Sequence, residues 1–175
     1  SEVREIIKDN NVISKIILKN GGTVFAKNYI FCSGGKTYSG TGSTGDGYSW
    51  AEKLGHKVSR LRPALVPVKI KDDWVKSLQG LSLKNVELSV FQSGKKKDSR
   101  FGELLFTHFG LSGPIVLDLS GHVGELLEGG EVHLFLDLKP ALDEQLLDKR
   151  IQSDFAKYAN KLFKNSLDDL LPQKL

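Results

Sequence analysis

The amino-acid sequence predicts an α+β fold with a β-rich beginning, a β-rich middle and a helical end. Short β-rich runs separated by turn residues fill residues 3–32. Extended and alternating runs fill most of residues 62–138, and the last part has an apolar period of about 3.6 residues. These patterns divide the chain into three predicted parts, residues 1–60, 61–140 and 141–175.

The first part begins with a predicted β-meander. Two β-rich runs, residues 3–8 and 12–19, are joined by Asp9-Asn10-Asn11, which is a strong hairpin signal. Asn20-Gly21-Gly22 then turns the chain into a third run at residues 23–27. We therefore expect a small antiparallel sheet.

A short buried strand and a glycine-rich stretch follow. The wholly apolar run Tyr29–Cys32 has the pattern of a strand that is buried on both faces. Residues 33–47 then contain six glycines, several hydroxyl side chains and one lysine. Glycines let a backbone approach a flat or phosphorylated ligand closely. We interpret this stretch as one wall of a cofactor site.

A helix is expected directly after the glycines. Ser43-Thr44-Gly45-Asp46 has the spacing of a capping box, in which the acid also favours the positive end of the helix dipole. Gly55 is a natural C-terminal cap. The helix is therefore predicted to lie between these two signals.

Two nucleotide-binding patterns match this stretch only in part. Gly35-Lys36-Thr37 resembles the end of a P-loop, but the first glycine that a P-loop requires falls at Ile30. Residues 40–45 spell G-x-G-x-x-G, yet seven residues separate them from the preceding strand. Both interpretations fail on spacing, which leaves a ligand-facing loop.

The middle part is predicted to be an antiparallel sheet or a small barrel. Residues 63–70 are extended, because each proline biases the residue before it away from the helix. Strands are expected at residues 83–91, 102–107 and 131–138, with a short helix at 113–119.

The end of the chain is predicted to be helical. Residues 143–163 carry an apolar stripe at helical spacing, with charged residues elsewhere. The stripe consists of Leu147, Ile151, Phe155, Tyr158 and Leu162. Residues 166–169 have the pattern of a cap for another helix.

A second dense cluster lies at residues 107–114, Thr-His-Phe-Gly-Leu-Ser-Gly-Pro. His108 beside a strand end, followed by a glycine-rich turn, is typical of a proton donor next to an anion-binding helix start. A tight turn with a structurally hydrogen-bonded histidine explains the same residues. The sequence leaves both interpretations open.

Composition argues against several kinds of partner. The net charge is only +4, and Lys95-Lys96-Lys97 is explained by a solvated hairpin loop, so nucleic acid is not an expected partner. No apolar run approaches ~20 residues, so no membrane partner is expected. His56, His122 and His133 lack partners at metal-ligand spacing, and the single Cys32 cannot form a structural zinc site, so no metal site is expected.

Two further counts bear on the origin of the chain. One cysteine forms no internal disulfide, which is consistent with the expected cytoplasmic location. The sequence contains no methionine, whereas a complete bacterial open reading frame starts with one. We therefore expect the chain to be an internal fragment of a larger protein.

Four motifs in sequence order resemble the signatures of one family. They lie at residues 33–38, 41–48, 61–67 and 106–114. They are similar to successive signatures of the bacterial FAD-dependent, NAD(P)/FAD-type oxidoreductases often labelled the aminoacetone oxidase family. A more distant similarity connects them with flavoproteins of the fumarate reductase type. The resemblance covers nearly the whole chain.

The resemblance implies a role for each part of the chain. Residues 1–60 become the later part of a Rossmann-like FAD domain, residues 61–140 a β-rich insert domain and residues 141–175 the start of a helical subdomain. Lys36 and His108 become candidate catalytic residues that face the flavin or the substrate. The implied cofactor-binding residues are Ser33, Gly34, Gly35, Thr44, Gly45, Asp46 and Gly47.

The implied activity is that of an FAD-dependent oxidoreductase acting on a small organic substrate, by amine oxidation or enone reduction, with NAD(P)H as a candidate electron donor. The family's ADP-binding segment and its C-terminal flavin segment are absent from the sequence. We therefore expect the chain to be inactive alone and to have the remaining segments of its polypeptide as partners. A non-catalytic β-rich binding module is the alternative.

Overall fold

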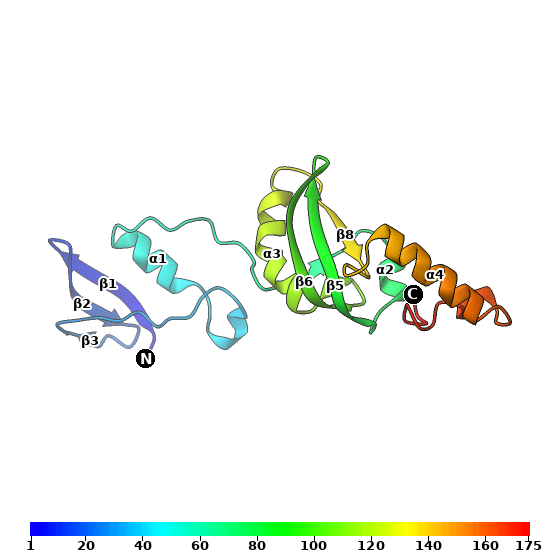
Figure 1. The fold of residues 1–175 in the computed structure, drawn as a ribbon. Coiled ribbons are helices and arrows are strands. Elements are labelled where there is room, and N and C mark those ends of the chain that lie inside the picture. Colours follow the sequence, from blue (N-terminus) through cyan, green and yellow to red (C-terminus); the bar gives the residue numbers. More distant parts are fainter. The chain divides into compact units, whose positions relative to one another are not determined.

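The computed structural model describes residues 1–175, apart from the side chain of Lys164. The fold is α+β, as predicted, and it forms two compact units, Ser1–Leu61 and Arg62–Leu175 (Figure 1). We call them the N-terminal unit and the C-terminal unit. The three-part division of the chain at residues 60 and 140 stays a prediction.

The N-terminal unit is a small sheet followed by a loop and a helix. Its strands form an antiparallel sheet in the order β1-β2-β3, which confirms the predicted meander. Asn10 and Asn11 have φ values of 46° and 65°, as a two-residue turn with the strands' twist requires. The elements are β1 Val3–Asp9, β2 Val12–Leu18, β3 Thr23–Val24, the 3-10 helix η1 Ser39–Thr41 and α1 Asp46–Lys53.

The prediction of a buried strand at Tyr29–Cys32 is wrong. These residues form no strand, and the side chains of Ile30 and Phe31 are 88% and 44% exposed. An extended run becomes a strand only when its backbone pairs with a neighbour, and no described strand of this chain pairs with it. The segment touches α1 instead, where the rings of Phe31 and Trp50 are 6.2 Å apart.

The N-terminal unit has no core of its own. None of its described residues is buried. Burying one large apolar side chain stabilises a fold by about 1.5–3 kcal/mol, and this contribution is largely missing here. Large side chains that remain exposed in this unit are Val12, Val24, Phe25, Ile30, Phe31, Tyr38 and Leu61.

The C-terminal unit is a five-stranded sheet with helices. Its strands have the order β4-β7-β6-β5-β8, and every neighbouring pair is antiparallel. This confirms the antiparallel, barrel-like middle that the sequence predicts. The elements are β4 Val68–Lys69, α2 Trp74–Ser77, β5 Ser82–Gln92, β6 Lys95–Phe106, β7 Gly110–Ser112, α3 Pro114–Leu127, β8 His133–Asp137, α4 Glu144–Lys157 and η2 Phe163–Asn165.

The core lies between α3 and the sheet. Along β5, Leu83 and Val86 are both buried although they are three residues apart. A bulge around Asn85, whose φ is 56°, inserts one residue and brings both side chains to the same face. The buried residues of α3 that pack here are Ile115, Val116, Leu119 and Val123.

The helical end differs from its prediction. α4 begins as expected, because Asp143 accepts a hydrogen bond from the amide of Leu146 at 2.8 Å. It ends at Lys157 instead of continuing to Phe163. Lys157 and Tyr158 both bond to Asp169, so the chain turns back there and no further helix forms at residues 166–169.

The first prediction concerns Gly110 in β7. A Cβ added there would meet the carbonyl oxygen of Val68 inside van der Waals distance, and the amide nitrogen of Ile70 at 2.8 Å. We expect Gly110→Ala to lower the free energy of unfolding by about 2 kcal/mol or more, because β4 must move away. Urea unfolding of the chain, followed by circular dichroism, measures this loss.

Gly124→Ala is the matched control for this prediction. Gly124 lies inside α3, and nothing lies within 4 Å of an added Cβ. Alanine favours the helix over glycine by about 1 kcal/mol, so this variant should be as stable as the parent or more stable. Equal stability of the two variants would contradict the close packing of β7 on β4.

The second prediction concerns Asp98 in β6. Its carboxylate bonds to His122 Nδ1 at 3.0 Å and to the Arg100 guanidinium at 2.5 Å. The pKa of Asp98 lies below its usual range, chiefly because His122 donates a hydrogen bond to the carboxylate. The Ser99 amide and Arg100 lower this pKa further by smaller amounts, whereas partial burial raises it. A lowered pKa in the folded state adds stability above the unfolded-state pKa, and this stability is lost as pH falls through the folded-state pKa.

Asp98→Asn should therefore cost about 1 kcal/mol of unfolding free energy at neutral pH. The difference from the parent should shrink toward zero in acid, as Asp98 itself becomes protonated. Urea unfolding at several pH values checks this. A cost that stays constant down to the lowest pH would show that the charge of Asp98 is not the cause.

Candidate functional site

The glycine-rich loop packs directly on the start of α1. A Cβ added at Gly34 would meet Ser43 Oγ at 2.8 Å, and one added at Gly47 would collide with Ser33 Oγ. One added at Gly35 would lie 3.4 Å from the Tyr48 hydroxyl. The structure thus brings residues 33–35 and 43–48 together, as the sequence-based site requires. The same distances show that several of these glycines are needed for packing.

The first turn of α1 is open to an acceptor. Gly45, with φ 88°, is the N-cap residue, and no described side chain accepts a hydrogen bond from this helix end. The predicted capping box is therefore wrong, because the Thr44 hydroxyl bonds at 2.7 Å to the Asp46 carboxylate instead. Unpaired N–H groups at the positive end of the helix dipole attract negatively charged groups.

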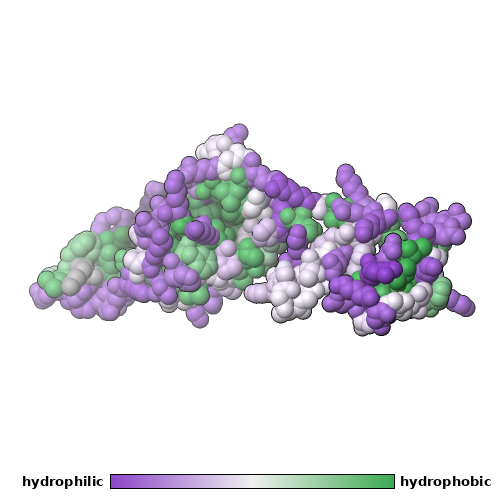
Figure 2. All heavy atoms as spheres, turned by 180° about the vertical axis from the view of Figure 1, so that it is seen from behind, coloured by the Kyte–Doolittle hydropathy of each residue, from purple (hydrophilic) through white to green (hydrophobic). Residues whose placement is uncertain are grey.

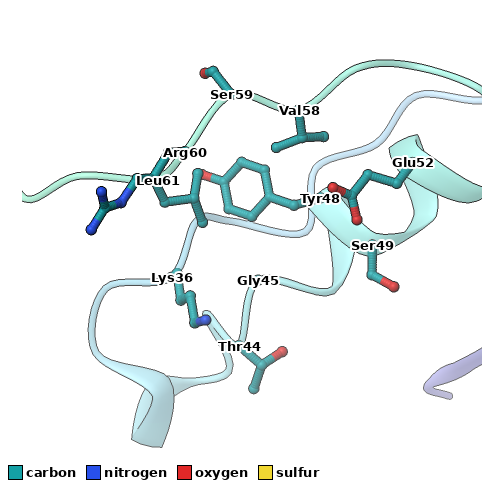
Figure 3. A pocket seen from close by; sticks show the side chains of 10 residues that line it. All are labelled: Lys36, Thr44, Gly45, Tyr48, Ser49, Glu52, Val58, Ser59, Arg60 and Leu61. Carbon is teal, nitrogen blue, oxygen red and sulfur yellow. The ribbon is translucent and has the colours of Figure 1, made fainter.

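A pocket of about 360 Å³ lies beside this helix start (Figure 3). Lys36 extends from the glycine-rich loop toward Thr44, and the ring of Tyr48 lies between α1 and the segment 58–61. The pocket is small for a complete cofactor, so it has room for one segment of such a molecule. Its lining residues are Lys36, Thr44, Gly45, Tyr48, Ser49, Glu52, Val58, Ser59, Arg60 and Leu61.

The chemistry of this pocket is mixed. Cationic groups come from Lys36 and Arg60, a carboxylate comes from Glu52, and hydroxyl groups come from Thr44 and Ser49. Cations and open N–H groups suit a phosphate, whereas carboxylates accept hydrogen bonds from a sugar or a polyol. The arrangement therefore fits a ligand that carries both phosphate and hydroxyl groups.

Seven of the ten lining residues were not among the site residues predicted from the sequence. They are Tyr48, Ser49, Glu52, Val58, Ser59, Arg60 and Leu61. A signal existed for Tyr48 and Glu52, because residues at i and i+4 lie on the same face of a helix. The sequence carries no such signal for Ser59 and Arg60, because an irregular segment brings them to the pocket.

The candidate catalytic residue His108 lies in the C-terminal unit. It is exposed, and its ring stands edge-on to Phe109 at 4.7 Å. His108 makes no hydrogen bond among the described residues, so the interpretation of His108 as a structurally hydrogen-bonded histidine is wrong. The tight turn is present, since Thr107 Oγ1 accepts from the Gly110 amide at 3.1 Å. The proposed role of His108, like that of Lys36, stays a prediction.

The residues that the structure describes include a free cysteine but no metal-binding cluster and no membrane-spanning helix. No cluster there of three or more His, Cys, Asp or Glu side chains has metal-binding geometry. None of the described helices combines the length and apolarity needed to cross a membrane. Cys32 is an exposed free thiol.

Residues 62–175, which are most of the chain, match the family model described as "HI0933-like protein barrel and H2TH domain". The chain belongs to the HI0933-like family. The match covers the whole C-terminal unit, which contains the five-stranded antiparallel sheet.

Curated proteins similar to this HI0933-like chain are enzymes. It is 33% identical over 178 residues to ribosomal RNA dihydrouridine synthase of Haemophilus influenzae, covering 100% of the chain and 41% of that protein. The Escherichia coli protein of that name is 32% identical over 175 residues, with 100% and 41% covered. The 3-dehydro-bile acid delta(4,6)-reductase of Clostridium scindens is 27% identical over 161 residues, with 91% and 39% covered.

These relatives bear on the expected partners of the chain and on its share of the family's length. Two of them are named for ribosomal RNA, so the expected absence of a nucleic-acid partner is not supported. The chain spans about two fifths of the length of the curated relatives that it matches.

The third prediction tests the packing of the glycine-rich loop on α1. We expect Gly47→Ala to speed amide hydrogen exchange in α1 by up to about tenfold, because overpacking costs about 1–3 kcal/mol and the helix propensity of alanine offsets about 1 kcal/mol of it. Replacing Ser33 by Ala removes the hydroxyl that the new Cβ would meet, leaving Ser33 Cβ at an ordinary 3.6 Å. The same Gly47→Ala change made in a Ser33→Ala background should then slow exchange, because alanine favours the helix over glycine by about 1 kcal/mol.

Comparison of the four proteins, namely the parent, both single variants and the double variant, isolates the contact between these two positions. An equal effect of Gly47→Ala in both backgrounds would show that the loop does not rest on the helix at this point.

Proposed function

We propose that the chain is part of an FAD-dependent reductase that saturates a C=C bond conjugated to a carbonyl group. The observation that carries this proposal is the chemistry shared by the relatives' names. A dihydrouridine synthase adds two hydrogen atoms across the uracil C=C bond, which is conjugated to a ring carbonyl. A delta(4,6)-reductase of a 3-dehydro bile acid acts on C=C bonds conjugated to the 3-oxo group. Amine oxidation has no such support.

A uracil base in ribosomal RNA is the substrate that we favour. The two relatives named for ribosomal RNA align with the whole chain at 33% and 32% identity, against 27% over 91% for the bile acid enzyme. Charge agrees with this choice, because residues 1–61 contain nine Lys and Arg against five Asp and Glu. Positive surface supports RNA binding through phosphate contacts. A small conjugated ketone is the second candidate.

The N-terminal unit fits one segment of FAD. The open first turn of α1 and Lys36 suit a phosphate, while Asp46 and Glu52 suit the hydroxyl groups of a ribityl chain. Residues 33–35 pack against the helix start, next to Lys36, which lines the pocket. When bound and reduced, FAD supplies the hydride for such a reduction, and NAD(P)H is the proposed source of its electrons.

The protein's own part of the chemistry is to orient the double bond and to supply a proton. Hydride addition at the β-carbon leaves negative charge on the α-carbon and the carbonyl oxygen, and a proton must reach the α-carbon. Lys36 and His108 are the candidate donors, and both are exposed nitrogen-bearing side chains of types that serve as general acids. A cationic donor would also stabilise the charge that develops on the carbonyl oxygen.

Activity requires more polypeptide than this chain. The N-terminal unit contains no buried described residue, and its pocket has room for only a segment of FAD. We therefore propose that the chain alone is inactive and that the complete cytoplasmic protein holds the cofactor with its remaining segments.

The fourth prediction tests the reaction in the whole polypeptide. Incubation with FAD, NAD(P)H and ribosomal RNA lacking dihydrouridine should add two hydrogen atoms to one or more uracil bases, measured by mass spectrometry of RNA fragments. A 3-oxo-4,6-diene steroid is the parallel substrate. Reduction of the steroid alone would move the assignment to small ketones, and reduction of neither would contradict the proposal.

Variants of the whole polypeptide separate the two candidate donors. Loss of the proton donor should lower turnover by about 10²–10⁴-fold while flavin stays bound. We expect this from Lys36→Ala or from His108→Ala, with Lys27→Ala and His133→Ala as matched exposed controls. Full turnover in both variants would remove these residues from the mechanism. A polypeptide without flavin would instead support the non-catalytic binding module.

A further inference from the structure

The sheet of the C-terminal unit has two open edges. In the strand order β4-β7-β6-β5-β8, the outer strands β4 and β8 each pair on one side only. No pairing joins β4 to β8 within the residues that the structure describes. In Figure 1, β8 lies at the border of the sheet beside β5. Each edge therefore presents backbone N–H and C=O groups without a partner strand.

The two edges face one shared, mostly apolar cavity of about 670 Å³. Val68 on the β4 side and Leu134 and Leu136 on the β8 side line it together. Figure 2 shows hydrophobic side chains gathered on one face of the C-terminal unit. Core residues at the base of the cavity are Leu88, Phe106, Leu111 and Val123. The sheet thus curls around its core without closing over it.

The β8 edge lacks the features that protect a permanently open edge. Natural edge strands carry prolines, bulges or inward-pointing charges that prevent further pairing. β8 contains no proline, pairs with β5 in regular register and points Leu134 and Leu136 inward. Trp74, which lines the cavity, is 60% exposed. These properties are typical of an edge that is covered.

Strand directions determine what kind of segment fits. Every neighbouring pair in the sheet is antiparallel, so β4 and β8, the first and fifth strands, run in the same direction. One additional strand can be antiparallel to both. We infer that a single extended segment of the same polypeptide, outside residues 1–175, inserts between β4 and β8 and closes the barrel.

Two findings favour this occupant over a second copy of the chain. The family is described as having a barrel, whereas the sheet described here is open. The curated relatives are more than twice as long as the chain, since it covers 39–41% of them. The inserted segment should alternate apolar residues, which face the cavity, with polar ones. This inference does not depend on the proposed redox activity.

Amide hydrogen exchange tests the inference by comparing the whole polypeptide with the 175-residue chain. Alternate amides of an edge strand point away from its neighbour. Those of β8 that do not pair with β5 should exchange about a hundredfold more slowly in the whole polypeptide. Amides of residues 87–91 in β5, which pairs with β6 on one side and β8 on the other, serve as the control and should be protected in both proteins.

The other outcomes would overturn the inference. Equally fast exchange of the β8 edge in both proteins would show that the edge stays open. Protection in the 175-residue chain that rises with protein concentration would assign the edge to a second copy. Protection that appears only after RNA is added to the whole polypeptide would assign it to the substrate.

Discussion

The described fold depends on burial of apolar side chains between α3 and the curled sheet. Leu88, Leu104 and Phe106 on the strands and Val116 and Leu119 on the helix are at most 2% exposed. The close approach of β7 to β4 at Gly110 extends the same sheet to its far edge. The N-terminal unit has no equivalent, because none of its described residues is buried. Stability and the proposed cofactor site therefore belong to different parts of the chain.

Much of the fold could be predicted because it depends on local signals. Asn10-Asn11 specifies a two-residue hairpin, and Asp143 caps α4 through its own side chain. The failures all involve contacts beyond the local sequence. Tyr29–Cys32 has the composition of a buried strand but no strand to pair with, and α4 ends early where Asp169 binds the residues at its end.

The candidate site was predictable to a similar extent. Sequence reasoning identified the glycine-rich loop and the helix start, and the structure packs them together. It missed Arg60, which an irregular segment brings to the pocket, and it assigned to Ser43 a capping role that the positive φ of Gly45 prevents. Which groups face a ligand depends on such loop geometry, and residue type alone does not determine it.

We propose that the N-terminal unit is one wall of an FAD site whose other walls lie elsewhere in the polypeptide. Titration of FAD into the 175-residue chain and into the whole polypeptide, followed by flavin fluorescence, tests it most directly. Saturable binding by the whole polypeptide, with little or none by the chain, is the predicted result. Equal affinity of the two proteins, or no binding by either, would contradict the claim.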